Sequence, residues 1–163
     1  MSPYPTQSGL RFHRVLGLGG SVRVVPRPVE IVEAFWAEVW QPPQNPDAVD
    51  DFVSEDFIIT SGGVDIVSRA AFKAWIIAFQ RTISGLEFDI IESFQNADGS
   101  RVASRFRMHG RNNGFLGTAP DQRPLAFTGT AIWAVRADGK LLHNWVERSA
   151  WEAYQSLERD ATR

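Results

Sequence analysis

The spacing of apolar residues changes near residue 85, and this change limits the possible folds more than any other feature of the sequence. Between residues 28 and 84, apolar side chains recur at the period of a helix with one buried face. Beyond that point, β-branched and aromatic residues alternate with polar ones in runs at 86–96, 101–112, 124–137 and 140–148. Asp98-Gly99 and Asp138-Gly139 are typical hairpin turns between these runs. Helices followed by successive antiparallel strands predict a segregated α+β domain.

Two long amphipathic helices are expected ahead of the strands. The first begins at Pro28, because proline suits the first helical turn, and it ends at Pro42-Pro43. The second follows Ser68, whose hydroxyl can cap the helix, and its apolar stripe runs to Ile83. The other expected elements are a short helical piece at 49–52, a strand at 57–60 closed by Gly62-Gly63, and a final helix capped by Ser149 and Glu152 with an apolar stripe of Trp151, Tyr154 and Leu157.

These elements predict one domain at 28–160, in which N-terminal helices pack on a curved, mostly antiparallel sheet. Such a layer arrangement forms an open cone, and a central pocket within it suits a small molecule. Residues 1–27 are rich in glycine and proline and are expected to form a flexible N-terminal extension.

Composition excludes several classes of function. The chain has no cysteine, so disulfides, zinc–cysteine sites and thiolate nucleophiles are excluded. Its formal net charge is -2 and its basic residues are scattered, which argues against nucleic acid and anionic membranes as partners. No apolar run approaches the length of a membrane span, so we expect a soluble or peripheral protein, and we predict a cytoplasmic location. The histidines have no metal-ligand spacing, and Gly17-Leu18-Gly19-Gly20 lacks a preceding strand, so neither a metal nor a nucleotide cofactor is expected.

Two local motifs resemble one known family. Residues 110–117 (GRNNGFLG) resemble the Gly-Thr-His-x-Gly-x-Phe-x-Gly run at the end of a long strand in the SnoaL-like polyketide cyclase group, shortened by one residue. Residues 139–145 (GKLLHNW) resemble its Gly-Lys-Ile-x-Glu-x-Trp strand. The chain is therefore identified, over about residues 29–158, as a member of this group within the nuclear transport factor 2-like superfamily. The resemblance implies a cone-shaped pocket and a homodimer packed through the sheets.

The sequence departs from this group at the positions that carry its chemistry. Val146 stands where the cyclases have an aspartate that acts as general acid and base in aldol ring closure, and valine cannot transfer a proton. Asn112 replaces the motif histidine, and an amide is not a base near neutral pH. Any proton transfer needs other side chains.

His109 and Glu147 are the candidate catalytic pair. Strand alternation places His109 on the arginine-bearing face of 101–112, which favours a surface or interface role, unless the bend near Gly110 turns it toward the cone mouth. Alternation also directs Glu147 and His143 outward if Val146 faces the pocket, unless a bulge flips the register. A pair of His109 and Glu147 on adjacent strands would suit proton transfer.

The predicted substrate-binding residues combine hydrogen-bonding and apolar groups. Asn144 shares the face of Val146 and either orients a substrate oxygen or satisfies a neighbouring backbone group. Thr130 can bond an oxygen too, although threonine is also simply a good strand former. The apolar lining is expected to comprise Trp40, Phe106, Met108 and Val146.

Two hypotheses of function follow. The first is a cofactor-free cyclase, isomerase or lyase that acts on a small hydrophobic metabolite, such as a polyketide or terpenoid, by acid/base proton transfer. The second is a non-catalytic module that binds a small apolar ligand or serves as a dimeric interaction domain, and the loss of both motif groups motivates it. In both, the expected partners are a small hydrophobic ligand and a second copy of the chain.

Overall fold

The helices of the N-terminal half form one layer of the domain. The computed structural model describes residues 26–161. Residues 1–25 of the predicted flexible extension therefore lie outside the described residues. α1 (Pro28–Phe35) continues as a π-helical turn, η1 (Trp36–Trp40), and a 3-10 turn, η2 (Pro46–Ala48), leads into the short α2 (Val49–Phe52). α3 (Arg69–Arg81) begins at Ser68, whose hydroxyl accepts a hydrogen bond from the Ala71 amide at 3.2 Å, so the predicted cap is confirmed.

The other layer is a six-stranded sheet in the order β2-β1-β6-β5-β4-β3. Its strands are β1 (Val53–Ser61), β2 (Val64–Val67), β3 (Ile83–Gln95), β4 (Arg101–Asn112), β5 (Pro124–Val135) and β6 (Leu141–Arg148). Only β1 and β6 pair in parallel, and the other neighbouring pairs are antiparallel. The predicted α+β class with a mostly antiparallel sheet is confirmed.

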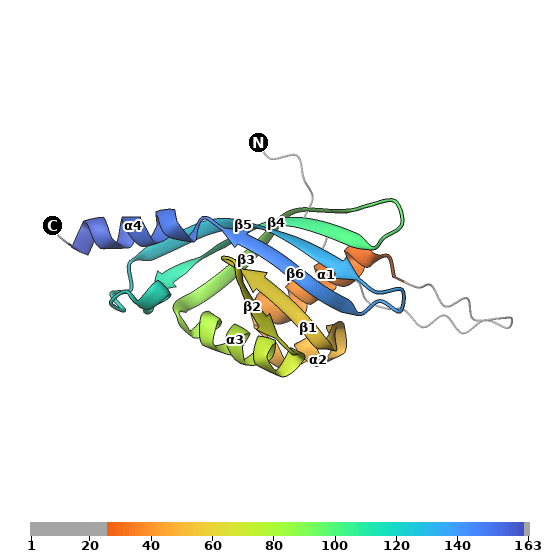
Figure 1. Cartoon of the computed structure of the whole chain (residues 1–163). Helices are drawn as coiled ribbons and strands as arrows, with labels where there is room; N and C mark the ends of the chain where they lie inside the picture. The colour runs from red at the N-terminus through yellow and green to blue at the C-terminus, as the bar shows by residue number, and fades with distance from the viewer. Residues whose placement is uncertain (1–25, 162–163) are drawn as a thin grey trace, which may run out of the picture.

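The sheet curves over the helices (Figure 1). α1, α2 and α3 lie on its concave side, whereas α4 (Ala150–Ala161) extends away from this helical layer past one end of the sheet. None of the helices within residues 26–161 is long and apolar enough to span a bilayer.

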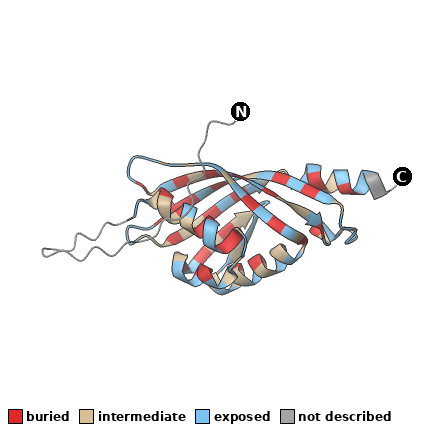
Figure 2. Ribbon diagram, turned by 180° about the vertical axis from the view of Figure 1, so that it is seen from behind, coloured by how far each residue is buried: buried red, intermediate tan, exposed pale blue. Residues whose placement is uncertain are grey.

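Aromatic side chains fill the space between the layers. Trp36 lies at the centre of this core, and its ring centroid is 4.7 Å from Phe88, 5.2 Å from Trp133 and 5.3 Å from Phe106. Buried residues follow the concave face of every long strand (Figure 2). Aromatic side chains therefore fill the interior of the cone along its axis.

Several local predictions need correction. Ile83 begins β3, opposite Asn112, instead of ending the helix, because α3 stops at Arg81. The chain after Gly62-Gly63 turns back as β2, an unpredicted edge strand. A bulge leaves Leu142 unpaired between β5 and β6, so Leu141 points into the core although alternation from Val146 directs it outward.

The final helix also differs from its predicted form. Ala153 and Leu157 are its buried residues, while Trp151 is 62% exposed and stacks on Tyr154. The Ser149 hydroxyl accepts a hydrogen bond from the Thr128 amide at 3.0 Å and so ties α4 to β5.

Gly129 permits the closest approach within the core, which gives a test of the packing. A methyl group at this position would lie 2.3 Å from the ring of Phe106, whose side chain is fully buried. We expect Gly129→Ala to lower the free energy of unfolding by about 1–3 kcal/mol, because the ring cannot retreat in a packed core. Urea unfolding followed by circular dichroism measures this, with the exposed Ala126→Ser as the control. An unchanged midpoint for Gly129→Ala would contradict the packing described.

Candidate functional site

A cavity of about 320 Å³ opens at the mouth of the cone. Its walls come from the middle of α3, the end of β6, the start of α4, the β1–β2 turn and the 3-10 turn η3 (Phe115–Gly117). The residues that line it are Ser61, Gly62, Trp75, Phe79, Phe115, Leu116, Val146, Glu147, Arg148 and Ala150.

Two walls of this cone-mouth cavity are aromatic. Trp75 and Phe79 occupy successive turns of the same face of α3, and their rings stack with centroids 5.2 Å apart. Phe115 meets Phe79 edge-on at 6.2 Å. Val146 completes the apolar surface from β6. Such walls suit a flat, weakly polar molecule.

Hydrogen bonds from Asn112 stabilise the loop that positions Phe115 in the cavity wall. Its Oδ1 accepts hydrogen bonds from the amides of Gly114 at 3.1 Å and Phe115 at 2.9 Å, and its Nδ2 donates to the Ala119 carbonyl at 2.8 Å. The side chain is fully buried. The residue at the motif-histidine position therefore has a structural task here, since it shapes one wall of the cavity.

Arg148 is the charged group of the cavity. Its guanidinium lies 5.3 Å from the ring centroid of Trp75 and 5.2 Å from that of Phe79, within cation–π range. Its Nη1 donates to the Ser61 hydroxyl at 2.8 Å, while its buried Nε has no hydrogen-bond partner among the residues described. Burial lowers the pKa of Arg148 to about 10, against the opposing effect of Glu147, so the group stays protonated at neutral pH.

Arg148 was not among the predicted site residues, although strand alternation indicates that its side chain faces the pocket. The alternation that placed Val146 toward the pocket also places Arg148 on that face, two residues further along β6. Two of the other predicted ligand groups, Asn144 and Val146, do point inward and are both buried. Val146 lines the cavity, whereas Asn144 lies deeper, beside Trp133, and its Oδ1 has no partner among the described residues.

The remaining predicted apolar residues belong to the packed core. Trp40 lies behind Trp75 and Phe79, with ring centroids at 6.3 and 5.7 Å. Phe106 and Met108 are fully buried under the helices. These three side chains support the cavity without being among its lining residues.

The predicted pairing of His109 with Glu147 is wrong. β5 lies between β4 and β6, so the two residues are not on adjacent strands. Both point to the convex, outer face of the sheet: His109 Nε2 is 3.2 Å from Asp89 and 3.8 Å from Glu87, and Glu147 is exposed opposite Thr130. Thr130 is exposed on the same face. The bend at Gly110 does not carry the imidazole to the cone mouth.

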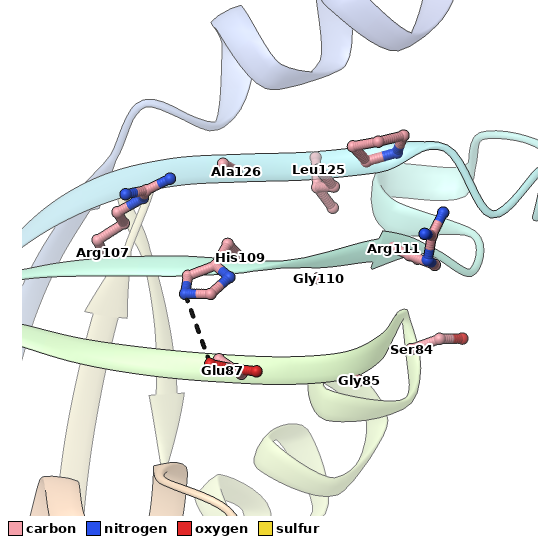
Figure 3. A pocket seen from close by; sticks show the side chains of 10 residues that line it. Ser84, Gly85, Glu87, Arg107, His109, Gly110, Arg111, Leu125 and Ala126 are labelled. Atoms are coloured by element: carbon pink, nitrogen blue, oxygen red, sulfur yellow. Dashed lines mark ion pairs between the residues drawn. The ribbon is translucent and has the colours of Figure 1, made fainter.

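His109 belongs to a second and larger hollow, of about 540 Å³ (Figure 3). This outer trough runs between β3, β4 and β5, and Arg107, His109 and Arg111 stand along it. It is broad and open, and charged groups make up much of its rim, so it offers little enclosure to an apolar ligand. The cone-mouth cavity is therefore the candidate site.

A sequence model of the SnoaL-like domain family matches residues 32–144. The chain belongs to the SnoaL-like domain family. The family predicted from the two motifs is thereby confirmed. No curated protein matches this SnoaL-like chain.

Solved structures agree with this family assignment. A protein assigned as a SnoaL-like polyketide cyclase from Jannaschia sp. CCS1 superposes with a TM-score of 0.72 and 16% identity, over 80% of this chain and 90% of its own. A protein assigned as a polyketide cyclase from Acidithiobacillus ferrooxidans gives 0.68 and 19%, over 83% and 97%. IdmH from Streptomyces antibioticus, also assigned as a polyketide cyclase, gives 0.67 and 17%, over 80% and 98%. At these identities the likeness establishes the fold of the SnoaL-like domain.

The other histidine of the sheet, His143, lies on the outer face of β6. Its Nε2 is 2.8 Å from the Thr60 hydroxyl, which in turn donates to Asp65 at 2.6 Å, and its ring stacks on Trp145 at 3.8 Å. Burial lowers the pKa of His143, and Asp65 opposes the shift. The folded state therefore favours the neutral imidazole.

This shift predicts a pH dependence of stability. An imidazole with a lowered pKa contributes stability above its unfolded pKa of about 6.5, and this contribution is lost as pH falls through the folded value. We expect the urea midpoint of the wild-type SnoaL-like domain to drop between pH 7.5 and pH 5.5 by more than that of His143→Gln, which cannot titrate. Equal drops in both proteins would show that His143 does not contribute.

Proposed function

We propose that this domain binds a small, flat, mostly apolar molecule in the cone-mouth cavity. The observation that carries the proposal is the cavity wall: stacked Trp75 and Phe79 face Val146, the residue at the cyclase aspartate position. An apolar wall at that position supports binding and offers no proton donor or acceptor.

A cyclase, isomerase or lyase activity on a polyketide- or terpenoid-like molecule is the second candidate function. The family match and the neighbours assigned as polyketide cyclases favour it. It needs a proton-transfer group other than His109, which lies on the outer face of the sheet, and other than Glu147, which borders the cavity but whose side chain the alternation along β6 directs outward. Incubation with a bound ligand separates the two candidates: recovery of the unchanged molecule supports binding alone, and a transformed product supports the enzyme.

Blocking the cavity tests the ligand site. N-phenyl-1-naphthylamine is a neutral, flat dye whose fluorescence rises in apolar surroundings. Ala150 lines the cavity at the start of α4, so the ring of Ala150→Phe fills the mouth. We expect this variant to weaken dye binding by about tenfold or more, measured by fluorescence titration.

Ala126→Phe is the matched control, since it adds the same ring to the outer trough. It is expected to leave dye binding unchanged. Loss of binding in Ala126→Phe with normal binding in Ala150→Phe would move the ligand site to the outer trough and refute the proposal.

A homodimer through the outer face of the sheet is the other part of the proposal. Trp145, Ile132, Ala103 and Phe94 lie directly opposite one another in successive strands, β6 to β3, and form an apolar row. Trp145 is 38% exposed, Ile132 46% and Phe94 59%. A continuous apolar row of this kind suits a self-complementary contact with a second copy across a two-fold axis.

A charge within this row tests the dimer. Ile132→Lys places a cation where two copies would meet and is expected to shift the chain from dimer to monomer, measured by size-exclusion chromatography with light scattering. Val64→Lys, at a position 65% exposed on the edge strand β2, is the control and is expected to leave the mass unchanged. A monomeric wild-type protein at micromolar concentration would exclude this dimer.

A further inference from the structure

Arg148 is a half-buried cation, and no carboxylate among the described residues pairs with it. The ion pairs of the described residues engage arginines at the surface, such as Arg69, Arg105 and Arg136, but none includes Arg148. Among the residues that the structure describes, its side chain makes one hydrogen bond, to the neutral Ser61 hydroxyl, and its Nε donor has no partner. The nearest carboxylate in sequence, Glu147, is exposed on the opposite face of β6.

A guanidinium without a carboxylate partner lowers the stability of the domain when no ligand is bound. Removing a guanidinium from water is costly, and a carboxylate partner normally offsets the cost. The rings of Trp75 and Phe79 compensate in part through cation–π contact, but they leave hydrogen-bond donors unused. Structural stability alone does not account for an arginine here, since an apolar side chain of similar size would pack against the same rings.

The geometry around the guanidinium suits an incoming planar anion. The two rings hold the side chain against α3, and Ser61 fixes one of its ends, so the group is oriented before any ligand arrives. Arginine presents its donors as a rigid fork, which matches the two oxygens of a carboxylate. Apolar side chains form the walls beside it, and a charge-assisted hydrogen bond is stronger beside apolar surroundings than in bulk water.

We propose that Arg148 is the anion-recognition residue of the cone-mouth cavity, and that the ligand is a flat apolar molecule carrying one carboxylate or a comparable planar anionic oxygen group. This inference rests on the proposed function of the cavity, and it adds the charge of the ligand. The flat body lies against Trp75 and Phe115, and the anionic end meets the fork of Arg148.

A pair of probes that differ in charge tests the proposal on the full chain. 2-Naphthoate and 2-naphthamide share the same ring system, but only the first is an anion at neutral pH. Isothermal titration calorimetry is expected to show that wild type binds naphthoate about tenfold or more tightly than naphthamide. Arg148→Met should abolish this preference and leave naphthamide binding within twofold of wild type.

Two further variants separate recognition from folding. Arg148→Lys keeps the charge without the fork and is expected to retain a smaller preference for naphthoate. Arg107→Met removes an arginine from the outer trough and is expected to keep the full preference. Without ligand, the thermal midpoint of Arg148→Met should equal or exceed that of wild type, whereas a purely structural arginine would lower it.

The outcomes distinguish this inference from the function on which it rests. Equal affinity of wild type for both probes overturns the role of Arg148 and leaves the apolar site intact, and so does a preference that survives in Arg148→Met. Failure of both probes and of the neutral dye to bind overturns the proposed function itself. The comparison of the two probes on wild type requires no variant to fold.

Discussion

The contact of Trp36 with the sheet is the interaction on which the rest of the structure depends. This single indole, at the junction of α1 and η1, meets rings from β3, β4 and β5 within 5.3 Å. It fixes the distance between the two layers, because aromatic rings in a dense core have little freedom to shift. With the axis of the cone filled in this way, the candidate site lies at the mouth, between α3 and the end of β6.

Local chemistry made most of the elements predictable. The helical stripe around Trp36, the Ser68 cap and the alternation along β4 each depend on near neighbours in the chain, and each prediction agrees with the structure. The errors arose from features that neighbours do not encode. The order of the strands separates His109 from Glu147, and the bulge at Leu142 reverses the direction of Leu141.

The candidate site was predicted only in part for the same reason. Val146 could be placed from its motif and its alternation, but the identity of its companions depends on how α3 and η3 cross the end of the sheet. Arg148 was accessible to the same alternation argument, yet a charged residue near a strand end is usually solvated, and only the contacts with Trp75 and Phe79 mark this one as different. Where the motifs predict an aspartate and a histidine, this chain has Val146 and Asn112, and the charged group of the cavity is Arg148 beside the rings of Trp75 and Phe79.

The parallel pairing of β1 with β6 determines when this cavity comes into existence. Ser61 and Arg148 meet across 87 residues of chain, whereas the antiparallel neighbours β3 to β6 follow one another directly. Contacts between distant segments form late, because a long loop must close before they are made. During synthesis, β1 cannot pair with β6 until almost the whole domain has left the ribosome. The cone-mouth cavity is therefore among the last features that this chain completes as it folds.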